Sequence, residues 1–303
     1  MRRLLPCLAV LVCAACAPFD DPPPPATPRP RVTVPVFAPP AGFERLRLGL
    51  VPFLAKDTIS AAHQRLASYL SRTLTVPVDV AVADSYSDAI ERMVKGEYDL
   101  VELSPYAYAK ASARVKLKCL AQTIADGSTT ASGYIFVRED SPRRTMAELK
   151  GATFAFVDPV STSGYLYARK LLKDSGLDFK NDLGRTEFLG NHEAVLLGVR
   201  DGRFDAGATY QGAFAALKRS KGIDPLTFRV IGKTPRTPRD ILCVRDDMPD
   251  VVAEAITRAL LALDGRERAG REILGPLNLN GFRAADDHAY DEIRRVAAEL
   301  EAE

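Results

Sequence analysis

The sequence has almost no net charge, few histidines and, after its first residues, no long apolar run. It contains 41 lysines and arginines against 39 aspartates and glutamates, a formal net charge of +2. Because the basic residues are not clustered, no nucleic-acid partner is expected. No later segment is long and apolar enough to span a membrane. His63, His192 and His288 lie far apart, and no cysteines or carboxylates stand at ligand spacing, so we expect no metal and no cofactor.

The N-terminus predicts the cell compartment. MRRLLPCLAVLVCAAC has two arginines, an apolar stretch and then small residues, which is typical of a secretory signal. Its ending, Ala14-Ala15-Cys16, resembles a bacterial lipobox, in which the cysteine is lipidated and becomes the first residue; an ordinary cleaved signal is the alternative. We predict a lipoprotein signal peptide over residues 1–16 and a periplasmic protein that Cys16 anchors to a bacterial membrane through lipid.

A proline-rich segment follows the signal. Residues 17–42 contain ten prolines, a composition that favours extended polyproline II and cannot bury enough apolar surface to fold. We therefore predict a disordered tether over 17–43. The remaining chain, from about Glu44, is long enough for one large or two medium domains.

Short apolar runs alternate with helical patterns along this body. Five of the runs predicted as strands are LRLGLV (46–51), VPVDVAVA (76–83), YDLVEL (98–103), TFAFV (153–157) and FDAGATY (204–210). Such alternation predicts an α/β fold with a mostly parallel sheet flanked by helices. Extended segments near 125–133 and 230–240 divide it into two lobes with two hinge crossings. We predict lobe 1 over 44–128 and 236–303, and lobe 2 over 129–235.

The turn DPVSTSGYL lies where a predicted strand becomes a helix. It places Ser161, Thr162, Ser163 and Gly164 together. Ser and Thr at such a place can simply cap the helix. The same position also suits an oxyanion, because free backbone N–H groups and the helix dipole add to the hydroxyl donors. Other polar loops also follow predicted strands, and ligands bind at that edge of an open sheet, so we favour a binding cleft between the lobes.

Several motifs in order resemble one family. DPVSTSGYL, GNHEAVLLGVRDGRFDAG, YDLVELSPYAYAKA, DSYSDAIERMVKGEYD and FRAADDHAYDEIRRV are similar to segments of the periplasmic substrate-binding proteins of phosphate/phosphite/phosphonate ABC transporters, of the phosphonate-binding type. The resemblance implies a two-lobe venus-flytrap fold, the type II periplasmic-binding-protein fold. It implies that the protein captures such an oxyanion and delivers it to an ABC permease. We also expect a monomer.

The resemblance also implies a set of ligand-binding residues. The Ser161, Thr162 and Ser163 hydroxyls, the close backbone approach at Gly164, and His192 would come from the second lobe. Tyr86 and Tyr108 would come from the first. Where family members take aminophosphonates, two carboxylates receive the ammonium; one aligns with Asp240, and the other aligns near Gly212 and is missing here. The resemblance therefore implies that 2-aminoethylphosphonate binds no better than non-amino ligands.

Two other functions fit parts of the sequence. A receptor of the same fold could present its ligand to a sensor kinase. A serine hydrolase could use Ser163 and His192 with Asp205 or Asp240, but the sequence has no Gly-x-Ser-x-Gly elbow, so we expect no enzyme activity. Cys119 and Cys243 lie in apolar runs and either form a disulfide or remain buried free thiols.

Overall fold

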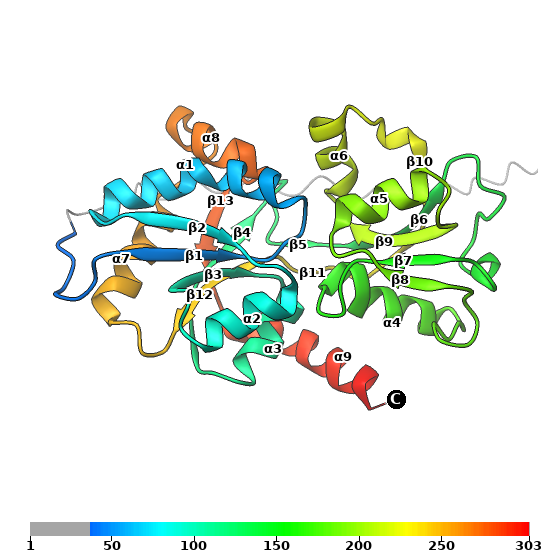
Figure 1. Ribbon diagram of the computed structural model, residues 1–303, viewed down its shortest axis with the longest axis horizontal. Coiled ribbons are helices and arrows are strands. Elements are labelled where there is room, and N and C mark those ends of the chain that lie inside the picture. Colours follow the sequence, from blue (N-terminus) through cyan, green and yellow to red (C-terminus); the bar gives the residue numbers. More distant parts are fainter. Residues whose placement is uncertain (1–36, 303) are drawn as a thin grey trace, which may run out of the picture.

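The computed structural model describes residues 37–302 and contains two sheets linked by a short two-stranded ladder (Figure 1). We call each sheet with its helices a lobe. The strands of the first lobe, in spatial order, are β13 (Gly281–Ala284), β4 (Leu117–Ile124), β12 (Ile241–Arg245), β3 (Leu100–Leu103), β1 (Leu46–Leu50) and β2 (Val78–Val82). Those of the second lobe are β10 (Phe228–Lys233), β6 (Gly133–Arg138), β9 (Ala206–Tyr210), β7 (Phe154–Phe156) and β8 (Thr186–Phe188).

Helices cover both faces of each sheet. The first lobe has α1 (Lys56–Leu74) and α7 (Asp250–Leu261) on one face and α2 (Tyr86–Val94), α3 (Pro105–Ser112) and α9 (Asp291–Glu301) on the other, with α8 (Arg268–Leu274) beside α1. The second lobe has α4 (Tyr167–Asp174), α5 (His192–Arg200) and α6 (Ala213–Lys221). Because both faces are covered, β3 is buried along its whole length, which explains its nearly continuous apolar run.

The sheets are mixed, whereas the sequence predicted mostly parallel ones. β1 pairs in parallel with β2 and β3, and β7 pairs in parallel with β8 and β9. The strands next to the hinge run the other way: β12 is antiparallel to β3 and β4, and β6 is antiparallel to β9 and β10. The reversal arises because these strands enter or leave their sheets through the crossings between the lobes.

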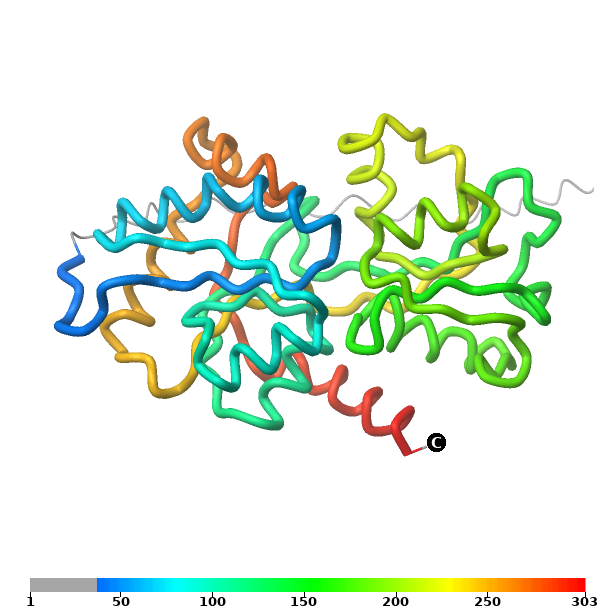
Figure 2. Tube along the Cα trace, in the orientation of Figure 1, coloured from blue at the N-terminus to red at the C-terminus, as the bar shows by residue number. Residues whose placement is uncertain are grey.

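Two crossings join the lobes through a ladder of β5 (Thr130–Ala131) and β11 (Thr237–Pro238). Figure 2 shows both passing between the sheets, while α9 extends from the first lobe beneath the gap toward the second. Strands β5 and β11 lie within the segments 125–133 and 230–240 that the sequence indicated as extended, while residues 230–233 belong to β10. Among the described residues, no helix is long and apolar enough to cross a membrane.

Three details differ from the expectations or extend them. Residues 37–43, expected to end the tether, lie on the first lobe: Phe37 is buried, and its carbonyl accepts a hydrogen bond from the Thr75 hydroxyl at 3.3 Å. The signal peptide, Cys16 and tether residues 17–36 lie outside the described residues. Strand β13 was not anticipated. Cys119 and Cys243 are register partners on adjacent strands, and both are free thiols.

Candidate functional site: a cleft between the lobes

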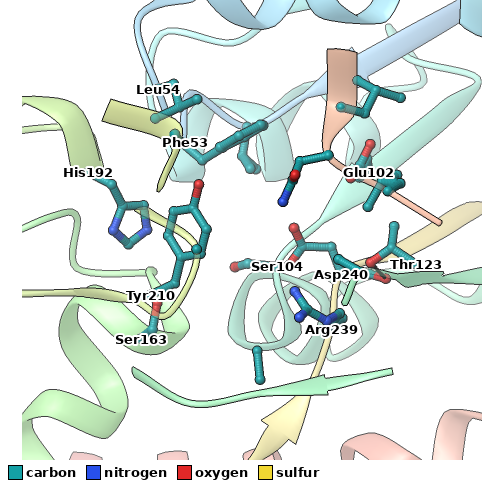
Figure 3. A pocket seen from close by; sticks show the side chains of 18 of the residues that line it. Phe53, Leu54, Glu102, Ser104, Thr123, Ser163, His192, Tyr210, Arg239 and Asp240 are labelled. Carbon is teal, nitrogen blue, oxygen red and sulfur yellow. Dashed lines mark hydrogen bonds between the residues drawn. The ribbon is translucent and has the colours of Figure 1, made fainter. Parts of the chain in front are cut away.

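The cleft between the lobes holds a cavity of about 180 Å³. The loops that follow β1, β2, β3, β7 and β8 lead into helices whose first residues line it or border it. Figure 3 shows the second-lobe side chains His192, Tyr210 and Ser163 facing Glu102, Ser104 and Asp240 of the first lobe. Several helix N-termini therefore point at one cavity, and their dipoles favour a negatively charged ligand.

Ser161 caps the helix at the predicted oxyanion turn. Its Oγ accepts a hydrogen bond from the Gly164 amide at 3.1 Å, and the chain then forms one π-helical turn (Thr162–Leu166) before α4. A Cβ at Gly164 would collide with Val157 and lie 2.9 Å from Ser161 Oγ. Glycine is therefore required by close packing. Ser161 is therefore a helix cap, and it also lines the cavity.

The other two hydroxyls of the turn have different partners. Thr162 Oγ1 accepts a hydrogen bond from the Tyr106 amide, at the start of α3 in the opposite lobe, at 2.8 Å. The Ser163 hydroxyl has no hydrogen-bond partner among residues 37–302 and faces the cavity. The amides of Thr162 and Ser163 begin the helix and have no intrahelical acceptor. The Ser163 hydroxyl and the two amides are thus available to a ligand, and they lie beside the hydrogen bond by which Thr162 contacts the opposite lobe.

His192 is a neutral donor at the start of α5. Its ring is buried, and burial lowers the pKa of His192 to about 3. Its Nδ1 lies 3.0 Å from Oγ1 of Thr209, whose hydroxyl has no other partner in the described chain. If the Thr209 hydroxyl donates to Nδ1, the Nε2 nitrogen carries the hydrogen and can donate to a ligand. The His192 amide itself donates across the cleft to the Phe53 carbonyl at 3.0 Å.

Tyr86 lines the cavity from the start of α2, as expected, but Tyr108 does not. The Tyr86 side chain is buried, and burial raises the pKa of its hydroxyl well above the usual range. The Tyr108 hydroxyl donates to Asp287 at 2.6 Å and lies 2.8 Å from Cys119 Sγ, in a separate groove between α3 and α9. The Tyr106 side chain lines the same groove, so neither tyrosine of α3 lines the cavity. We therefore remove Tyr108 from the expected ligand set.

Asp240 lies in the cavity just before β12. Burial and the negative charge of Glu102 raise the pKa of Asp240 to about 7, against the opposite effect of Arg239. Its carboxylate accepts no hydrogen bond from a residue in the 37–302 range. Arg239 also lines the cavity, but its Nε donates to the Ser128 carbonyl at 3.0 Å and its guanidinium lies 3.6 Å from Asp126.

The lining residues that the sequence analysis did not name as site residues include His63 on α1, Glu102 on β3 and Tyr210 at the end of β9. The sequence feature that could have indicated Glu102 is its position as a charged residue within the apolar run YDLVEL. Tyr210 is the last residue of the run FDAGATY, which the sequence predicted as a strand. His63 occupies a buried position of an amphipathic helix, where sequence alone does not reveal the cavity.

The geometry does not form a Ser–His–carboxylate triad within the described chain. The ring nitrogen of His192 that a triad would pair with a carboxylate faces Thr209 instead. Asp205 accepts hydrogen bonds from the Thr153 amide and hydroxyl at the opposite end of β9. A histidine with a pKa of about 3 is also a weak general base near neutral pH.

Comparison with known proteins identifies the family. The family model described as "ABC transporter, phosphonate, periplasmic substrate-binding protein" matches residues 48–290. The chain belongs to this family. It is 25% identical over 262 residues to a "Phosphate-import protein PhnD" of Mycolicibacterium smegmatis, covering 82% of this chain and 81% of that protein.

Solved structures of relatives share the fold. PhnD1 of Prochlorococcus marinus in complex with methylphosphonate superposes with a TM-score of 0.79 at 21% identity, covering 85% of this chain and 98% of that one. The binding component of a phosphonate ABC transporter from Pseudomonas aeruginosa has a TM-score of 0.78 at 22% identity, covering 84% of this chain and 85% of that chain. The two-lobe type II periplasmic-binding-protein fold is thus confirmed.

Proposed function

We propose that the cleft captures an oxyanion of the phosphonate, phosphite or phosphate class, and that the protein delivers it to an ABC permease. The observation that supports this most is the convergence of uncharged donors on one cavity: the hydroxyls and first amides of the 161–164 turn, and a buried neutral His192. A tetrahedral anion needs many such donors, and helix N-termini add to their attraction.

Ligand capture would stabilise the closed arrangement of the lobes. Three backbone amides already donate across the cleft: Tyr106 to Thr162, His192 to Phe53, and Tyr86 to the Asp158 carboxylate at 3.4 Å. A bound anion would add contacts from both sides, while β5 and β11 would absorb the hinge motion. A closed, loaded form offers a permease a surface that differs from that of the open form.

A titration series tests this function. The purified mature protein is titrated separately with methylphosphonate, phosphite and phosphate, and the heat of binding is measured by calorimetry. Sulfate is titrated in the same way as the comparison anion. We expect at least one of the three phosphorus anions to bind and to raise the melting temperature. If none of them binds, the proposal is wrong. For an anion that does bind, small-angle scattering at saturating ligand should give a smaller radius of gyration than that of the free protein.

We further propose that Cys16 carries a lipid that holds the protein at a bacterial membrane, and that the mature protein is a monomer. The lipobox-like sequence before Cys16 supports this. In the Cys16→Ser variant, expressed in a bacterium, we expect an unprocessed precursor or a soluble product. Detergent partitioning identical to that of the unchanged protein would contradict the anchor, and sedimentation measures the oligomeric state.

A further inference from the structure

Two cysteines face each other across adjacent strands of the first lobe. Cys119 of β4 is the register partner of Cys243 on the antiparallel strand β12. Side chains of directly opposed residues project from the same face of a sheet, and both cysteines pack in the apolar cluster beneath α2, α3 and α9. Residues 17–303 contain no other cysteine. Within the folded chain, each thiol is therefore the only possible disulfide partner of the other.

The position of the two cysteines in the ladder suits a disulfide. The Asp246 amide donates to the Lys116 carbonyl at 2.9 Å, which makes these residues a hydrogen-bonded pair at the end of the same ladder. Such pairs alternate with non-hydrogen-bonded pairs along antiparallel strands, so Cys243 and Cys119, three positions further on, form a non-hydrogen-bonded pair. The Cα atoms of these pairs are about 4.5 Å apart, within the range of about 4.4–6.8 Å that disulfides span. The two sulfurs can therefore be joined without a large backbone movement.

One of the two thiols is accessible from outside. Cys243 is fully buried, whereas Cys119 is half-buried and lines the groove between α3 and α9. The Cys119 Sγ lies 2.8 Å from the Tyr108 hydroxyl, whose own hydrogen goes to Asp287, so the Cys119 thiol donates to Tyr108. Burial raises the pKa of both thiols, so both are protonated near neutral pH and react slowly. An incoming disulfide therefore meets Cys119 first.

Oxidation of the pair requires reduction of another disulfide. The family is periplasmic, and disulfides form and persist in that oxidising compartment. The Cys119 sulfur, once it has lost its proton, attacks a protein disulfide or glutathione disulfide, forms a mixed disulfide and releases one thiol. Cys243 then attacks the Cys119 sulfur, and a second thiol leaves. The two protons and two electrons that the cysteines lose are thus carried away by the two released thiols.

We propose that Cys119 and Cys243 form a disulfide in the periplasm, and that this bond holds together the two chain segments of the first lobe. The structure shows the reduced form, in which both thiols are free. Strands β4 and β12 belong to different segments, because the chain between them forms the whole second lobe. The disulfide therefore encloses that lobe in one covalent loop. Closing so long a loop lowers the entropy of the unfolded chain and stabilises the folded protein.

Peptide mapping tests the bond. The full chain is expressed in a bacterium, and the exported protein is denatured in the presence of N-ethylmaleimide and digested with trypsin. Cleavage after Lys118, Arg138, Arg239 and Arg245 releases peptides 119–138 and 240–245. We expect these peptides to be joined to each other, to carry no maleimide and to be lighter than their sum by two hydrogen atoms. Maleimide on both peptides of the exported protein would overturn the disulfide.

Thermal melts test the stabilising role. The oxidised wild type should melt at least about 4 °C above the same protein reduced with dithiothreitol. Cys119→Ser cannot form the bond, so dithiothreitol should leave its melting temperature unchanged. Equal melting of the oxidised and reduced wild type, or an equal effect of dithiothreitol on Cys119→Ser, would overturn this role. Neither test involves an anion, so both outcomes are separate from that of the proposed function.

Discussion

Thr162 and Tyr106 connect the two lobes directly: the Tyr106 amide donates a hydrogen bond to Thr162 Oγ1 at 2.8 Å. Both residues begin helices that point at the same cavity, and Thr162 is 5% exposed. The hydroxyl of Thr162 therefore helps to close the cleft in addition to lining it.

Thr162→Val tests this contact. Valine keeps the shape but leaves the Tyr106 amide without its acceptor, so we expect a more open ensemble and binding weakened by about ten- to a hundred-fold. Small-angle scattering of the free variant should give a larger radius of gyration than the wild type. Thr186→Val, at an exposed position of β8, is the control; equal scattering and affinity in both variants would contradict the role of Thr162.

Ser161 and Ser163 separate capping from ligand binding. Ser161→Ala removes the cap on Gly164, and a lost cap reduces the free energy of unfolding by about 1 kcal/mol. Ser163→Ala removes a hydroxyl with no hydrogen-bond partner in the described chain, so its melting temperature should match that of the wild type while its anion affinity falls about tenfold or more. A Ser163→Ala variant with unchanged affinity would show that this hydroxyl does not contact the ligand.

The sequence predicted such local features better than side-chain directions. Ser161 lies in the turn where the sequence indicated a possible helix cap, and its Oγ accepts from the Gly164 amide at 3.1 Å. Tyr108 was misassigned because its direction depends on α9 and β4, which pack against it from distant parts of the chain. Glu102 was missed because a charge in an apolar strand becomes informative only when the cavity beside it is known.

Asp240 makes stability depend on pH. Its pKa is raised to about 7 in the folded protein, whereas an unfolded aspartate titrates near 4. Between these values the folded state holds the extra proton, so the free energy of unfolding falls as pH rises. Asp240→Asn removes this loss of stability. We therefore expect the melting temperature of the variant minus that of the wild type to increase from about pH 5 to about pH 8.

His192 provides a control of opposite sign. Its pKa is lowered to about 3 by burial, and an unfolded histidine titrates near 6.5. The unfolded state therefore holds the extra proton between these values, and stability rises with pH across that window. His192→Gln should remove this rise. Parallel pH profiles of the wild type and both variants would show that neither group is perturbed.

The last turn of α9 holds the lobes together at a second place. Glu299 pairs with Lys173 of α4 at 3.1 Å, and the Leu300 carbonyl accepts from Arg169 at 3.2 Å. The neighbouring Glu301 accepts from Tyr106 of α3 at 2.6 Å. This turn of α9 therefore contacts helices of both lobes on the side that Figure 2 shows beneath the gap.

Breaking the contact between α9 and α4 should favour the open form. Exposed ion pairs contribute at most about 1 kcal/mol, so Arg169→Leu with Glu299→Gln should weaken anion binding by about three- to tenfold and enlarge the free protein in scattering. Asp174→Asn, which removes an ion pair within α4 alone, should do neither. A double variant that binds and scatters like the wild type would exclude α9 from closure.

The most direct test of oxyanion capture compares the wild type with a triple variant, Ser161→Ala, Thr162→Val and Ser163→Ala. Both proteins are titrated with methylphosphonate, phosphite and phosphate in a calorimeter. A thermal melt of each protein checks that it is folded. The account predicts that the wild type binds at least one of these anions and that the folded triple variant loses at least about a hundredfold in affinity. Undiminished affinity in the triple variant would contradict the assignment of this turn as the anion site.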